Sequence, residues 1–151
     1  ADMTAMQPSC SPDWRAYALS SGMLCAALAM RKQADAVSMP AALDTLVETL
    51  AQDLQSRASF ATYWDYTNLM DLLLYHQFWR ATAERLAPDQ ERIAHADQLL
   101  EVALMRWPSP GELDSVRWRI EQIVRTLEEG DFKESVMAML IRIRAHASSA
   151  P

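Results

Sequence analysis

The chain has 151 residues, of which 50% are hydrophobic and 23% charged, and its formal net charge is −6. This length and balance are typical of one globular domain and exclude a disordered chain. Acidic residues outnumber basic ones in both halves, so the composition offers no basic footprint for a phosphate backbone, and we expect no nucleic-acid partner. With only three glycines and an abundance of strong helix formers, the sequence predicts an all-α fold.

The first predicted helix begins at Ser11, with Pro12 at its first position, and ends near Lys32. It is apolar on most sides, which is typical of a central helix. Its apolar stretch, residues 17–30, is too short to cross a bilayer, so we expect no membrane insertion.

The two cysteines bear on the compartment of the protein. Cys10 precedes the first predicted helix and Cys25 lies inside it, which separates them by roughly 20 Å if the helix is continuous. A disulfide requires Cα atoms within about 7 Å, so we expect two free thiols, which suit a reducing cytoplasm. The alternative is an exported protein, if Ala1 is a processed N-terminus.

Two further helices are predicted in the middle of the chain. The second begins near Ser38 and carries a narrow apolar stripe that ends at Leu54, with Asp53 on its solvated side. The third starts after Ser59 and runs to about Leu86, where the following proline ends it. It is unusually long and aromatic.

The fourth predicted helix covers about residues 89–107, and its apolar stripe, in steps of three and four residues, ends on Trp107. Ser109 and Glu112 form the pattern of a capping box that opens the fifth helix. A sixth helix opens at Asp131 and carries a similar apolar stripe. The links after the third helix are short, so neighbouring helices should run antiparallel.

We therefore expect about six helices in one domain, residues 1–151, with residues 1–10 and 147–151 flexible. The arrangement is an antiparallel bundle or an array of helical hairpins. The second interpretation comes from residues 94–145, where Ala96-x3-Leu100-x2-Ala103-Leu104-x3-Pro108 and the turn at residues 129–132 resemble tetratricopeptide-like hairpins. The first-helix signature of that family is absent, because Trp118 is followed three residues later by Glu121.

Aromatic residues gather at the start of the third predicted helix, spread over almost two turns: Phe60, Tyr63, Trp64 and Tyr66. Neighbouring residues on a helix point about 100° apart, so these side chains cannot all face one small core. The arc is either wrapped by neighbouring helices or exposed as an anchor for a partner protein. We consider these four residues the candidate partner-binding site.

Polar residues further along the same helix form a second candidate site, a polar pocket that contains Asn68, Asp71, Tyr75 and His76. A metal site that also uses Glu91 and His95 is one interpretation, although helical di-metal sites use Glu-x-x-His pairs and none is present. The other interpretation is a solvated helix edge. We therefore expect no metal and no cofactor.

The chain lacks the motifs of nucleophilic catalysis, of zinc hydrolysis and of phosphate-binding loops, so we do not expect an enzyme. Nine methionines and the surplus aromatics provide adaptable apolar surface. We expect a protein-interaction module, such as an adaptor, a secretion-type chaperone or a small subunit, whose partner is another protein or a second copy. The alternative is a helical enzyme or a ligand- or metal-binding bundle that uses the polar residues of the third helix.

Overall fold

The computed structural model describes residues 43–59 and 61–149. This part of the chain contains five α-helices and no strand, which confirms the all-α prediction. The helices are α2 (Leu43–Ser56), α3 (Tyr63–Thr82), α4 (Gln90–Leu104), α5 (Pro110–Thr126) and α6 (Asp131–Ser149). The first predicted helix, with both cysteines, lies outside the described residues. None of the described helices is long and apolar enough to cross a membrane.

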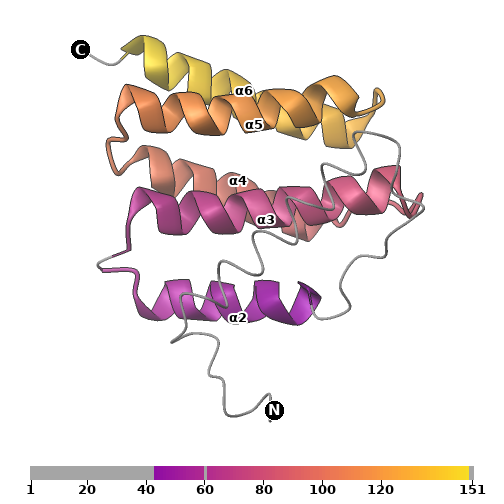
Figure 1. Cartoon of the computed structure of the whole chain (residues 1–151), viewed down its shortest axis with the longest axis horizontal. Coiled ribbons are helices and arrows are strands. Elements are labelled where there is room, and N and C mark those ends of the chain that lie inside the picture. Colours follow the sequence, from indigo (N-terminus) through magenta and orange to yellow (C-terminus); the bar gives the residue numbers. More distant parts are fainter. Residues whose placement is uncertain (1–42, 60, 150–151) are drawn as a thin grey trace.

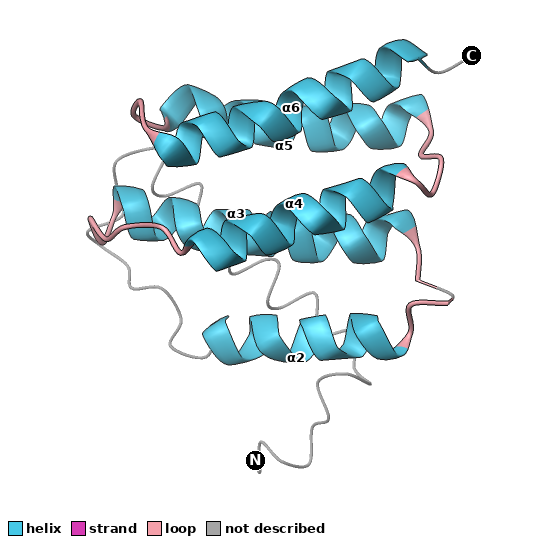
Figure 2. Ribbon diagram, turned by 180° about the vertical axis from the view of Figure 1, so that it is seen from behind, coloured by secondary structure: helices cyan, strands magenta, loops and turns pink. Residues whose placement is uncertain are grey.

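The helices form three tiers, which Figures 1 and 2 show from opposite sides. One tier is α2, the middle tier is the antiparallel hairpin of α3 and α4, and the last tier is the antiparallel hairpin of α5 and α6. The two hairpins pack on each other mainly through α4 and α6. Short links between the helices enforce this antiparallel order, as the sequence predicted.

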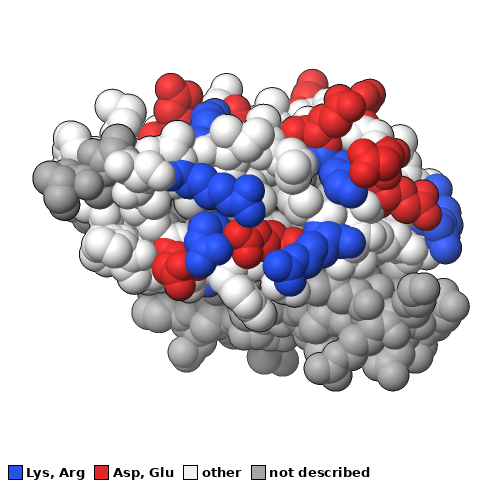
Figure 3. All heavy atoms as spheres, turned by 90° about the horizontal axis from the view of Figure 1, so that it is seen from above, with Lys and Arg blue, Asp and Glu red and all other residues white. Residues whose placement is uncertain are grey.

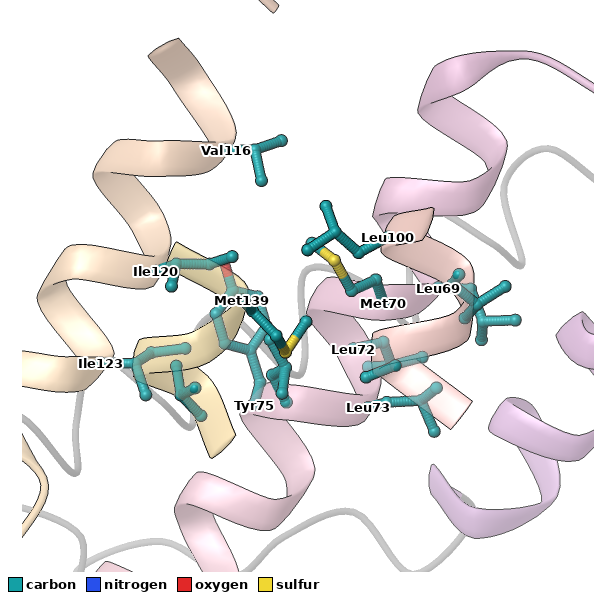
Figure 4. Close-up of a cluster of buried hydrophobic side chains, with 14 of the residues drawn as sticks. Leu69, Met70, Leu72, Leu73, Tyr75, Leu100, Val116, Ile120, Ile123 and Met139 are labelled. Atoms are coloured by element: carbon teal, nitrogen blue, oxygen red, sulfur yellow. The ribbon is translucent and has the colours of Figure 1, made fainter. Parts of the chain in front are cut away.

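Helix α3 is the centre of the described core. Every residue from Leu69 to Trp79 is buried, so the helix is surrounded rather than packed on one face. In Figure 4, Tyr75 projects from α3 toward the side of α5 and α6, while Leu69 and Leu73 project from the opposite side. The apolar surplus of this helix is therefore accommodated by neighbours on several sides.

The ends of α3 differ from the sequence prediction. The helix begins later than expected because Thr62 and Asp65 form a capping box, in which the Thr62 amide donates to the Asp65 carboxylate at 2.8 Å. It ends at Thr82 rather than Leu86, because Arg85 adopts a left-handed backbone conformation with φ 56°.

Asp53 of α2, expected on a solvated side, is buried and accepts a hydrogen bond from Arg57 Nε at 3.0 Å.

The start of α5 and the apolar stripes of α5 and α6 agree with the sequence prediction. The capping box of Ser109 and Glu112 opens α5, and the predicted apolar stripes of α5 and α6 are buried. Helix α6 remains helical through Ser149, although we expected residues 147–151 to be flexible. Its last turns therefore extend beside the end of α4 and form one wall of the surface described below.

Candidate functional site

The aromatic residues at the start of α3 do not share one surface. Tyr63 and Tyr66 are buried, and Trp64 is 40% exposed with its ring edge-to-face against Tyr63 at 5.2 Å between centroids. The Tyr63 hydroxyl donates to the Glu112 backbone carbonyl of α5 at 3.1 Å, which locks this ring between the two hairpins. Phe60 lies outside the described residues. Of the three described residues of this candidate site, only Trp64 is therefore exposed.

The polar row of α3 contains a buried ion pair. Asp71, only 3% exposed, contacts Arg119 Nη2 of α5 at 2.8 Å, and Arg119 Nη1 donates to Ser115 Oγ at 2.8 Å. Tyr75 is buried next to Asp71 on the same helix, whereas Asn68 is exposed. The predicted polar pocket is thus an internal connection between α3 and α5 in which one carboxylate already has a cationic partner.

Burial dominates the electrostatics of this pair. Removal from water raises the pKa of Asp71 from its ordinary value of 3.8 to about 7, even though the Arg119 guanidinium beside it opposes the shift. Burial also raises the pKa of the Tyr75 hydroxyl, and the Asp71 charge adds to that increase. Both groups are therefore held toward their neutral forms inside the core.

The residues considered for a metal site do not converge. His76 is buried on α3, Glu91 is exposed in the first turn of α4, and His95 is half-buried. Burial lowers the pKa of His95, as does the charge of Arg92, while Glu48 of α2 opposes the change. Among residues 43–59 and 61–149, no group of three or more metal-ligating side chains comes together.

An apolar groove lies elsewhere, between the C-terminal ends of α4 and α6. Its volume is about 650 Å³, and it is open to solvent. Seven residues line it: Glu101, Leu104, Met105, Trp107, Arg142, Ala145 and His146. Trp107 is 83% exposed and Met105 72% exposed, so the two largest apolar side chains in the groove are available to another molecule. We call this surface the α4–α6 groove.

Trp107 departs from the sequence prediction, which placed it in the buried stripe of the fourth helix. Helix α4 ends at Leu104, and Trp107 has a left-handed backbone with φ 54°. A bulky residue in this conformation is strained, and a residue before a proline normally prefers an extended backbone. The sequence did contain one signal: Pro108 makes a helical conformation at Trp107 unfavourable, so the stripe could not continue to it.

The neighbouring Arg106 fixes the direction of Trp107. Its Nη2 atom donates to the Ala58 carbonyl at 3.0 Å and to the Tyr66 hydroxyl at 3.1 Å, and the guanidinium carbon lies 5.3 Å from the centroid of the Tyr66 ring. Arg106 therefore anchors the α4–α5 link to α3 and to the α2–α3 link. Arg106 is thus bonded to the rest of the protein, while the next residue, Trp107, extends into solvent.

The charged side chains around the groove differ in whether they already have a partner. Arg142 of α6 contacts Asp97 Oδ1 at 3.0 Å and also donates to the Asp97 backbone carbonyl at 3.1 Å, so it connects α6 to α4. His146 lies against Trp107, with 6.3 Å between the ring centroids. Glu101 is exposed on α4. The groove therefore combines an exposed indole with an exposed carboxylate, while its arginine is already neutralised.

The face of the α5–α6 tier contrasts with the groove. Figure 3 shows basic and acidic side chains interspersed over this face, with no large area of one sign. Arg117 pairs with Asp114 and Glu121, and Arg144 reaches Glu121 at 3.1 Å. The described residues of this face therefore carry both signs of charge close together. Comparisons of the chain with protein-family models, curated proteins and solved structures find no match.

Proposed function

We propose that the chain is a non-catalytic protein-interaction module and that its partner binds in the α4–α6 groove. The observation that carries this proposal is Trp107, which is strained, 83% exposed and held outward by its neighbour Arg106. Strained residues concentrate at functional sites, and tryptophan is the residue most enriched among the energetic anchors of protein interfaces. Met105 beside it adds flexible apolar area that adapts to a partner.

The interaction function is favoured over a ligand-binding or catalytic function of α3. A site on α3 would require accessible polar groups, but Asp71 and Tyr75 are buried and Asp71 is paired with Arg119. The two stacked hairpins are compatible with the tetratricopeptide-like array suggested by the sequence, and we propose that arrangement as the scaffold of the groove. An adaptor, a chaperone or a subunit of a complex would each use such a surface, and we propose a cytoplasmic setting from the two expected thiols.

The test compares two variants of the full chain as baits in lysate of the organism that encodes it. We expect the wild-type chain to retain a partner and the double variant Met105→Ser, Trp107→Ser to retain about tenfold less, because the main apolar anchors are removed. Trp118→Ser is the matched control, since Trp118 is also exposed but lies on α5, away from the groove lining. Equal recovery by all three proteins would contradict the proposal.

A further inference from the structure

We infer that the segment bound in the α4–α6 groove is an amphipathic helix of another protein whose apolar face is bordered by a lysine or arginine. This inference rests on the proposed function and specifies the chemistry of the partner. It follows from the apolar lining of the groove, from the charge left available at its rim and from the aromatic face of Trp107.

The groove is open to solvent and is lined mainly by apolar side chains. Leu104, Met105 and Trp107 line it from the end of α4, and Ala145 lines it from α6. The small residue on one side and the large ones on the other leave an open volume of about 650 Å³ between them. Helices that bind in such grooves present apolar residues spaced three and four apart, which places them on one face.

The described lining of the groove contains one carboxylate, that of Glu101. Glu101 extends from α4 as an exposed carboxylate, and Arg142 is paired with Asp97. Arg106 keeps its positive charge, because among the described residues it bonds only to the Tyr66 hydroxyl and the Ala58 carbonyl, but it does not line the groove. Among the seven lining residues, Glu101 is therefore the acidic group that a basic residue of the partner can approach. The chain as a whole also carries a net charge of −6, which attracts basic segments at long range.

Trp107 strengthens the preference for a cation. An exposed indole offers the best aromatic face for a lysine or arginine side chain within about 6 Å of the ring. Glu101 and Trp107 line the same groove, so one basic side chain on the partner is attracted by both. A partner with glutamate at this position would face repulsion from Glu101 and no gain from the ring.

A second copy of the chain fits this chemistry less well. Its α5–α6 face carries the exposed residues Trp118 and Ile141, but the arginines Arg117 and Arg144 on that tier are paired with carboxylates of the same tier. Using them in the groove would break existing ion pairs. A separate protein with unpaired basic residues beside its apolar face has no such cost.

The experiment uses the full chain labelled with 5-fluorotryptophan, so that each of its five tryptophans gives a fluorine resonance, with Trp107 assigned from Trp107→Phe. The probes are two synthetic helical peptides with the same leucine stripe, one bordered by lysines and the other by glutamates. We expect the lysine peptide to shift the Trp107 resonance and to bind about tenfold more tightly than the glutamate peptide. Higher salt should reduce this preference.

Charge reversal gives the decisive control. Glu101→Lys should invert the order of the two peptides, whereas Glu128→Lys should leave it unchanged, because Glu128 makes the same change in net charge but follows the far end of α5. The inference is overturned if neither peptide shifts Trp107, if both bind equally, or if Glu101→Lys leaves the order unchanged. It is also overturned if the Trp107 resonance changes with the concentration of the chain alone, which would identify a second copy as the occupant.

These outcomes are distinguishable from failure of the proposed function. If the lysate experiment gives a partner that depends on Trp107 but neither peptide binds, the chain remains an interaction module and only the basic amphipathic helix is wrong. If both peptides bind equally and shift Trp107, the groove binds apolar helices and the role of Glu101 is wrong. If both experiments are negative, the groove is not a docking site.

Discussion

Helix α3 and the α4–α5 link are both rich in large apolar side chains, but the protein uses them in opposite ways. In α3 the run from Leu69 to Trp79 is buried, and its charged residue Asp71 is satisfied inside the molecule. In the link, Met105 and Trp107 are 72% and 83% exposed, and Arg106 between them is hydrogen-bonded to Tyr66 of α3. Aromatic content alone therefore does not identify a binding surface; the backbone that directs each side chain decides whether it is buried.

The largest expected effect is in the core of α3. Phe78→Ala should reduce the free energy of unfolding by about 3–5 kcal/mol, because Phe78 is fully buried and its removal leaves a cavity. Trp107→Ala, which removes a larger but exposed ring, should change it by less than about 0.5 kcal/mol. Urea unfolding at constant pH measures both. Similar losses of unfolding free energy for the two variants would mean that Trp107 is buried in the full chain, as Phe78 is. The difference between α3 and the α4–α5 link would then not exist.

The next effect concerns the charge between the two hairpins. Asp71→Ala should cost about 3 kcal/mol, since it leaves Arg119 largely buried without its carboxylate. Asp114→Ala is the matched control: it removes a carboxylate from an exposed ion pair with Arg117 and should cost no more than about 1 kcal/mol. Equal small losses in chemical unfolding would show that the α3–α5 pair contributes little to the interface.

The same pair predicts a pH dependence with a definite sign. Because the folded-state pKa of Asp71 is raised from 3.8 to about 7, the folded protein binds this proton more tightly than the unfolded chain. Its contribution to stability is therefore complete at pH values below 3.8 and decreases as the pH rises to about 7. His95, whose pKa is lowered, contributes with the opposite sign, so wild type must be compared with Asp71→Asn. The difference between their unfolding free energies should fall from pH 4 to 7; a constant difference would contradict the raised pKa.

The smallest effect should be a gain. Trp107→Asn should stabilise the chain by about 1 kcal/mol, because asparagine tolerates the left-handed backbone that strains a tryptophan. Met105→Asn is the control, since Met105 is also exposed but has a right-handed helical backbone with φ −70°. Thermal unfolding should show a higher Tm for the first variant only. A lower Tm for Trp107→Asn would mean that the indole contributes packing energy.

The features that the sequence predicts correctly depend on residues that lie close together in the chain. The all-α class and the start of α5 depend on residues that act within one turn, such as Ser109 and Glu112. The burial of Tyr63 and Tyr66 depends instead on Glu112 and Arg106, which lie 49 and 40 residues away in the chain. No pattern within α3 contains that information, so its aromatic start could be interpreted as exposed or as buried.

The α4–α6 groove was missed for a similar reason. Its lining comes from two helices that are separated by α5, and the periodicity of each helix describes only its own buried stripe. Trp107 was assigned to such a stripe because its spacing continued the pattern of α4, although Pro108 limits the helix there. If the predicted helix is ended before Pro108, Trp107 lies in the following link and is no longer assigned to the buried stripe.

The length of α6 has a consequence for local opening of the molecule. After Ile143 no residue of this helix through Ser148 is buried, so its last turns rest on few apolar contacts. Segments of this kind exchange their amide hydrogens through small fluctuations, whereas amides of α3 should exchange only when the whole domain unfolds. The turns that carry Ala145 and His146 are also one wall of the groove. Amide exchange there should therefore be fast in the free protein and should slow as soon as the groove is filled.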